Sequence, residues 1–146
     1  MMTLRLFLAF AFVCVSTACA VGAIHLYPVE ASNVGQPQRP ILSGTIIVAG
    51  PSATISFQLP DGEKLHGPCT FGSAAGVNDD LREPWDSVYG QGDYLAHVVG
   101  SPAHCTATLT GSKGTVFHVE SYNETAGTPL KGIAQDSNGN IYKLGL

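Results

Sequence analysis

The side chains best suited to bind a ligand lie close together in one block of the chain, residues 85–99. Aromatic rings offer a ligand a large apolar area with polar tips, and the glycines between them would let it approach closely. The sequence therefore predicts four candidate ligand-binding residues for a glycan or a peptide, namely Trp85, Tyr89, Tyr94 and His97. In the alternative interpretation, Trp85, the only tryptophan of the chain, plugs one end of the domain.

Acidic side chains surround this tryptophan in the sequence, and paired carboxylates are the acid and base of glycoside hydrolases. The acidic residues are Asp79, Asp80, Glu83, Asp86 and Asp93. Such residues more often form a solvated loop, and the sequence does not set the distance between any two carboxylates. The chain also lacks the G-x-S-x-G pattern of a nucleophilic serine. We therefore predict no catalytic residue and a protein that is not an enzyme.

Three histidines could hold a metal if neighbouring strands brought them together, because neutral imidazole is a common metal ligand. They are His97, His104 and His118. In the predicted strands, however, His97 shares a face with Leu95 and Val99, whereas His104 shares a face with outward-pointing threonines. The spacing matches no zinc pattern, so the sequence predicts neither a metal site nor a cofactor.

Short runs of Val, Ile and Thr alternate with turns along the chain, which contains 17 Gly and 9 Pro. This pattern predicts an all-β fold, a small antiparallel barrel or sandwich of about eight strands that hides its edges. A short helix is expected within residues 72–93, beginning at Pro84 and ending at Gly90. The predicted strands are residues 41–49, 53–59, 64–71, 94–99, 104–110, 115–122, 132–135 and 141–146.

Residues 1–20 are predicted to be an export signal peptide, because Arg5 precedes a run of ten apolar residues. That run is shorter than the about 20 residues needed to span a bilayer. The sequence Ser-Thr-Ala-Cys at residues 16–19 resembles a bacterial lipobox, which implies lipidation of Cys19 and an outer-membrane lipoprotein facing the periplasm. Two alternatives stay open: cleavage after Ala20, giving a periplasmic or secreted protein, and a retained membrane anchor.

Residues 21–40 contain three prolines among polar residues, which predicts an extended tether, with residues 24–27 docking on the domain. Residues 41–146 then form a single β domain. Cys69 and Cys105 remain after the signal peptide and the lipid site are set aside. An exported protein meets an oxidising compartment, so we predict a disulfide between them, with two buried free thiols as the alternative.

Without the signal peptide, six basic residues face eleven acidic ones, a net charge of −5. A negative surface argues against nucleic acid as a partner and against electrostatic binding to anionic lipid. Membrane attachment is therefore expected through the N-terminal lipid anchor.

Three motifs stand out in the second half of the chain. They are the W-D-x-V-Y-G-x-G-x-Y-x-A-H-V block of residues 85–98, a T-G-x-x-G-T turn at residues 110–115 and the terminal G-N-I-Y-K at residues 139–143. A chain with these motifs resembles an uncharacterised family of small bacterial exported proteins and lipoproteins. The resemblance implies no reaction, substrate or cofactor.

Together these features predict a non-enzymatic envelope lipoprotein or secreted β domain that binds an envelope protein or a cell-wall glycan. One alternative is a periplasmic protein similar to the small disulfide-bonded β-barrel lipoproteins that inhibit lysozyme, because an acidic surface suits a basic enzyme. A second alternative is a small hydrolase that uses the acidic loop near Trp85.

Overall fold

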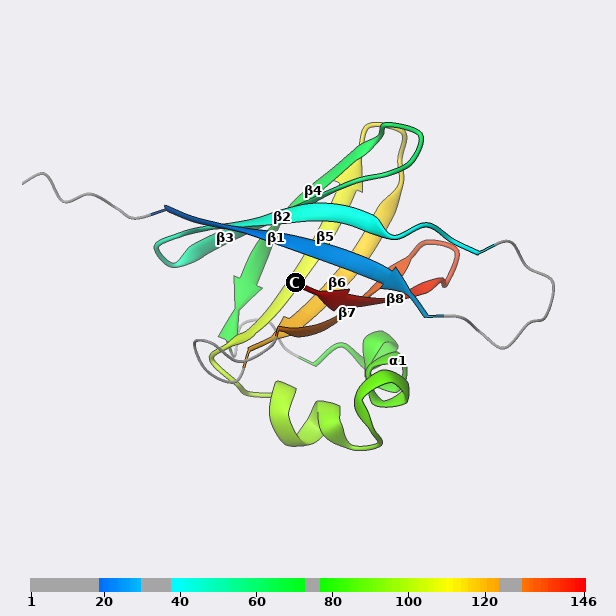
Figure 1. Cartoon of the computed structure of the whole chain (residues 1–146). Helices are drawn as coiled ribbons and strands as arrows, with labels where there is room; N and C mark the ends of the chain where they lie inside the picture. Colours follow the sequence, from blue (N-terminus) through cyan, green and yellow to red (C-terminus); the bar gives the residue numbers. More distant parts are fainter. Residues whose placement is uncertain (1–18, 30–37, 73–76, 124–129) are drawn as a thin grey trace, which may run out of the picture.

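Eight antiparallel strands form a closed barrel in the computed structural model, which describes residues 19–29, 38–72, 77–123 and 130–146 (Figure 1). Each strand pairs with the next along the chain, and the last pairs with the first to close the sheet. The predicted fold class is confirmed, and of the two predicted architectures the structure is the barrel. The strands are β1 (Cys19–Pro28), β2 (Leu42–Ala49), β3 (Ser52–Gln58), β4 (Lys64–Phe71), β5 (His104–Gly111), β6 (Val116–Tyr122), β7 (Lys131–Asp136) and β8 (Ile141–Gly145).

The first strand lies where the sequence predicted an extended tether. β1 pairs with both β2 and β8 and is part of the barrel wall. Ile24 and Leu26 are fully buried in the barrel, which is the alternation expected of a strand with one face in the core. The tether prediction is therefore wrong for residues 21–28, and residues 30–37 lie outside the described part of the chain.

A second correction concerns residues 94–99, which the sequence predicted as a core strand. They contain instead a π-helical turn, η2 (Tyr94–Val98). Tyr94 and Val98, four residues apart, are fully buried, whereas Leu95 and His97 between them are exposed. A short apolar run fits a buried strand and a buried helix equally well, and only its surroundings decide between them.

The expected short helix is α1 (Asp79–Tyr89). Its buried residues, Leu81 and Trp85, lie one turn apart and form the face that packs on the barrel. The helix ends at Gly90 as predicted, but it begins five residues before Pro84, so Pro84 is not its first residue. Within the described ranges, no helix combines the length and the apolar character needed to cross a membrane.

Apolar side chains fill the inside of the barrel. Glycines permit close packing in the wall. For example, a Cβ atom at Gly44 would collide with the Phe57 ring, and one at Gly67 with the Thr108 carbonyl. The buried core residues are Ile24, Leu26, Leu42, Ala53, Ile55, Phe57, Leu65, Cys69, Cys105, Ala107, Leu109, Phe117, Val119, Ala134, Tyr142 and Leu144.

A second core lies on the outer face of the barrel, where α1 and η2 cover the wall (Figure 1). Tyr122 and Ile133 point outward from β6 and β7, because the inward positions belong to their neighbours. The four buried residues of α1 and η2 pack against these two side chains. We call α1 and η2 together the helical layer.

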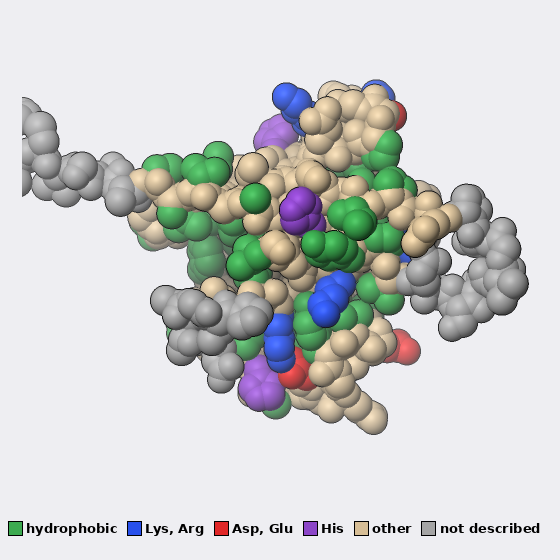
Figure 2. Space-filling view, viewed as in Figure 1, with side chains coloured by type: hydrophobic (Ala, Val, Ile, Leu, Met, Phe, Trp, Pro, Cys, Tyr) green, Lys and Arg blue, Asp and Glu red, His purple; other side chains and the backbone are tan. Residues whose placement is uncertain are grey.

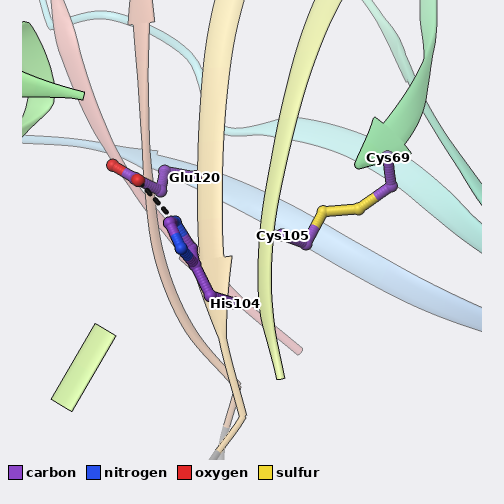
Figure 3. The surroundings of a disulfide bond; sticks show 4 residues. All are labelled: Cys69, His104, Cys105 and Glu120. Atoms are coloured by element: carbon purple, nitrogen blue, oxygen red, sulfur yellow. Dashed lines mark hydrogen bonds and ion pairs between the residues drawn. A yellow bond between two sulfur atoms is a disulfide. The ribbon is translucent and has the colours of Figure 1, made fainter. Parts of the chain in front are cut away.

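The predicted disulfide joins Cys69 on β4 to Cys105 on β5, with their Cα atoms 5.8 Å apart (Figure 3). Both cysteines belong to the inner core. The bond links two adjacent strands through the barrel interior and closes a loop of 36 residues.

Replacing Cys69 and Cys105 together by alanine is expected to lower the free energy of unfolding by about 3–4 kcal/mol, the chain-entropy value for a loop of this length. Urea denaturation followed by circular dichroism measures the difference. A thiol reductant provides the control, because it should lower the midpoint of the original chain and leave the double variant unchanged. Equal midpoints without reductant would show that the bond does not stabilise the fold.

Candidate functional site

Three of the four predicted ligand-binding residues form a packed aromatic cluster. The Trp85 ring lies 4.9 Å from the Tyr89 ring and 6.0 Å from the Tyr94 ring, measured between centroids. Trp85 and Tyr94 are fully buried, so neither offers a surface to a ligand in this structure. The Tyr89 hydroxyl donates to the Gly132 carbonyl at 2.9 Å and accepts from the Gly132 amide at 2.8 Å. The rings meet as predicted, but they form the core of the helical layer on the outer wall.

Asp93 fastens the segment after α1 to the barrel. Its carboxylate accepts hydrogen bonds from Trp85 Nε1 at 3.0 Å and from Lys131 Nζ at 3.1 Å. The Nδ1 atom of His97, the fourth predicted residue, lies 3.3 Å away, and this side chain is exposed. Burial raises the pKa of Asp93, but the Trp85 and Lys131 hydrogen bonds and the Lys131 charge outweigh it and hold the pKa below its usual value. Asp93 thus serves as a structural acceptor between the helical layer and β7.

A buried polar network lies beneath the helical layer. Glu120 on β6 accepts a hydrogen bond from the Tyr94 hydroxyl at 2.7 Å. His104 Nε2 lies 2.5 Å from the same carboxylate oxygen (Figure 3). All three side chains are fully buried. Burial and the neighbouring carboxylate raise the pKa of Tyr94, so its hydroxyl keeps the proton that it donates. The Asn78 amide donates to the same hydroxyl at 2.9 Å, which connects the network to the start of α1.

Glu120 was missed in the sequence because of its place on the strand. It alternates with the inward-facing Val119 and so points outward, where a glutamate is normally solvated. His104 also lies on the outer face, as the sequence predicted, yet the helical layer covers both residues. The signal available in the sequence was the aromatic block of residues 85–94, which needs an apolar surface to pack against.

An open groove of about 650 Å³ crosses the outer face of β4, β5 and β6 beside the start of α1. We call it the outer groove. Asp79 and Asp80 on its helix side are exposed, so this side carries negative charge. The strand side offers threonine hydroxyls and an imidazole. The groove therefore suits a partner rich in positive charge or hydroxyl groups. Its lining residues are Pro68, Thr70, Val77, Asn78, Asp79, Asp80, Thr106, Ala107, Thr108, His118 and Val119.

Negative charge continues along the exposed side of α1. A second hollow there has three acidic residues and one basic residue, Arg82. It is lined by Asp79, Arg82, Glu83, Asp86, Ser87 and Gln91. The outer groove and this side of α1 together form a continuous acidic surface, because Asp79 belongs to both.

The three histidines considered as metal ligands lie apart and have separate partners. His97 is beside Asp93, His104 is beside Glu120, and His118 Nδ1 lies 3.3 Å from the Thr108 hydroxyl. Across the residues that the structure describes, no group of three or more His, Cys, Asp and Glu residues is placed to hold a metal ion.

Comparisons with protein-family models, with curated proteins and with solved structures found no match for this chain. The family resemblance expected from the three motifs therefore stays a prediction. Cys19, the predicted lipid site, is the exposed first residue of β1 and carries a free thiol.

Tyr94→Phe is expected to destabilise the fold by about 1–3 kcal/mol, because it removes a donor from the buried Glu120 carboxylate. Urea denaturation monitored by Trp85 fluorescence would measure the loss. Tyr27→Phe is the matched control, because Tyr27 is 39% exposed on β1. Equal midpoints for the two variants would contradict a role for the Tyr94 hydroxyl in holding the helical layer.

Proposed function

We propose that this chain is a non-enzymatic protein of the bacterial envelope, exported and anchored by lipid at Cys19, which binds a protein or a cell-wall component. The observation that carries the proposal is the outer groove. It combines an open polar wall with the exposed carboxylates of Asp79 and Asp80. Such a surface favours recognition by hydrogen bonds and charge, which steer the association of a complementary partner.

The filled barrel supports binding on the outside. Barrels of about eight strands either enclose a small ligand or fill their interior with side chains. Here sixteen buried residues occupy the interior, including Phe57, Phe117 and Tyr142. A partner therefore has to be recognised by the outer wall.

Export is supported by the disulfide, because such bonds persist in oxidising compartments. Cys19 is exposed, so its thiol is accessible for acylation. An acyl chain there would join the barrel wall directly, because β1 begins at this residue.

A binding role is favoured over catalysis by where the acids and bases lie. Glu120 and His104 are fully buried and out of reach of a substrate. Asp86 accepts a hydrogen bond from the Tyr94 amide at 3.0 Å, and Asp93 accepts from Trp85. These carboxylates are engaged in holding the helical layer, which leaves the hydrolase alternative with little support.

The second candidate is an inhibitor of lysozyme in the periplasm. It is favoured by the acidic surface along α1 and the outer groove, which would complement a basic enzyme. Both candidate functions use the outer groove. In the second, the partner is lysozyme.

The intact mass of the protein purified from membranes of a bacterial expression host tests the anchor. We expect a chain that starts at Cys19 with added acyl mass and two hydrogens fewer for the disulfide. Cys19→Ser should lose the acyl mass. A mass that corresponds to a chain starting at Val21 without lipid would refute the anchor and indicate a secreted β domain.

Binding in the outer groove can be measured by cosedimentation with purified peptidoglycan and by inhibition of a basic lysozyme. Asp80→Asn is expected to weaken whichever interaction is found, because it removes a charge from the groove. Asp61→Asn is the matched control, since Asp61 is an exposed acidic residue between β3 and β4 that lines neither the outer groove nor the acidic side of α1. Added salt should weaken binding to lysozyme through screening.

Retention of full binding by Asp80→Asn would exclude the outer groove as the site. Equal weakening by both variants would point to the overall charge of the protein instead. Inhibition of lysozyme without binding to peptidoglycan would favour the second candidate over the first.

A further inference from the structure

The end of the barrel at which β1 begins projects at the left of Figure 1, and at the same place Figure 2 shows apolar side chains and no charged ones. We call it the apolar tip. Neither residues 19–28 nor residues 40–60 contain Asp, Glu, Lys or Arg. On the outer side, its exposed residues are Cys19, Val21 and Ala23 on β1, Ile47 and Ala49 on β2, and the uncharged polar residues Ser52 and Thr54 on β3.

Two large side chains dominate the apolar tip. Val21 and Ile47 lie directly opposite each other in the β1–β2 pairing, and they are 67% and 40% exposed. Cross-strand neighbours of this kind form one continuous apolar patch. A patch of apolar side chains without charge marks a contact surface for something apolar.

The position of Cys19, the proposed lipid site, points to lipid as the apolar contact. Cys19 and Val21 are two residues apart on β1 and so point to the same side of the wall. An acyl chain on Cys19 would therefore emerge beside Val21 and Ile47. The ten apolar residues of the predicted signal peptide also end only four residues before Cys19, so a retained leader would place hydrocarbon at the same point.

The charge distribution favours the same contact. The acidic residues of α1 would be repelled by anionic headgroups, whereas the apolar tip has no charge to be repelled or desolvated. It also has no basic residue, so its contact with a bilayer does not depend on anionic lipid.

We propose that the apolar tip rests on the lipid bilayer, with Val21 and Ile47 entering the boundary between headgroups and acyl chains. The contact fixes the orientation of the barrel beside its anchor. This inference rests on the proposed lipid anchor at Cys19 and adds to it a defined face of the protein that meets the membrane.

Quenching by brominated lipid tests this orientation. The acylated protein carrying Ile47→Trp is reconstituted into phosphatidylcholine vesicles with bromine-labelled acyl chains. Most of the emission of the introduced indole should be lost. Leu95→Trp is the matched control, because Leu95 is 47% exposed on η2. Trp85 is fully buried and provides a constant background in both variants.

Vesicles that also contain phosphatidylglycerol should give the same quenching, because the apolar tip has no cation. Val21→Trp repeats the test if Ile47→Trp does not fold. In acylated protein, quenching at position 47 or 21 that is no greater than at position 95 would refute contact of the apolar tip with the bilayer. The proposed lipid anchor at Cys19 would be unaffected by that result.

Absence of the acyl mass would instead refute lipidation of Cys19. Flotation of the unacylated chain with vesicles would then test whether the apolar tip contacts the bilayer. Flotation with phosphatidylcholine that Ile47→Asp abolishes and Leu95→Asp preserves supports the tip. No flotation of the original chain overturns it. A dimer in solution that Ile47→Asp dissociates would also overturn it, because the patch would then be covered by a second copy.

Discussion

The pairing of β1 with β8 is the constraint on which the rest of the structure depends. Strands joined in chain order leave two exposed edges unless the first meets the last, and such edges pair with other chains. The pairing of residues 25–28 of β1 with β8, in which Leu26 lies opposite Leu144, closes the sheet along this stretch, while residues 19–24 pair with β2. It also completes a wall of eight strands, whose interior is just wide enough to be filled by side chains. Because the interior is full, the proposed binding of a partner would have to take place on the outer wall, and closure of the sheet limits where a binding site can lie.

On that wall, the helical layer and β6 depend on each other through Glu120. A buried carboxylate without donors is costly, and the Tyr94 hydroxyl supplies a hydrogen bond that the covered face would otherwise lack. The layer cannot lift away without exposing its aromatic cluster and leaving Glu120 short of that partner. The same hydroxyl accepts from the Asn78 amide at the start of α1. The acidic side of the outer groove, Asp79 and Asp80, is thus held in place by a network that has no access to solvent.

The features that the sequence predicted well are those with a local cause. Clean alternation gives β3 and β5, and Gly90 gives the end of α1. The disulfide was predicted on other grounds, from the two cysteines that remain in an exported chain. The errors arise where a distant segment decides. The segment predicted as a tether forms β1, which pairs with β2 and with the distant β8. Residues 94–99 contain a helical turn, whose buried side chains pack on the outer face of β6 and β7. The prediction that Trp85 and Tyr94 face a ligand failed in the same way. The sequence shows that these rings need an apolar contact, but it does not show that the distant strands β6 and β7 provide it.

The position of β1 also limits where a lipid-anchored form of this protein can act. A tether of twenty extended residues would let the domain reach about 66 Å from a membrane. β1 instead enters the barrel wall at Cys19 itself, so an acyl chain there leaves no free linker. The outer groove could then meet only partners that come to the bilayer surface. An anchor without a linker also presses one end of the barrel against lipid, where a charged side chain would have to lose its hydration. β1 begins at Cys19, and residues 19–23 and 46–53 carry no charge. Both features suit a barrel end that lies against lipid without a linker.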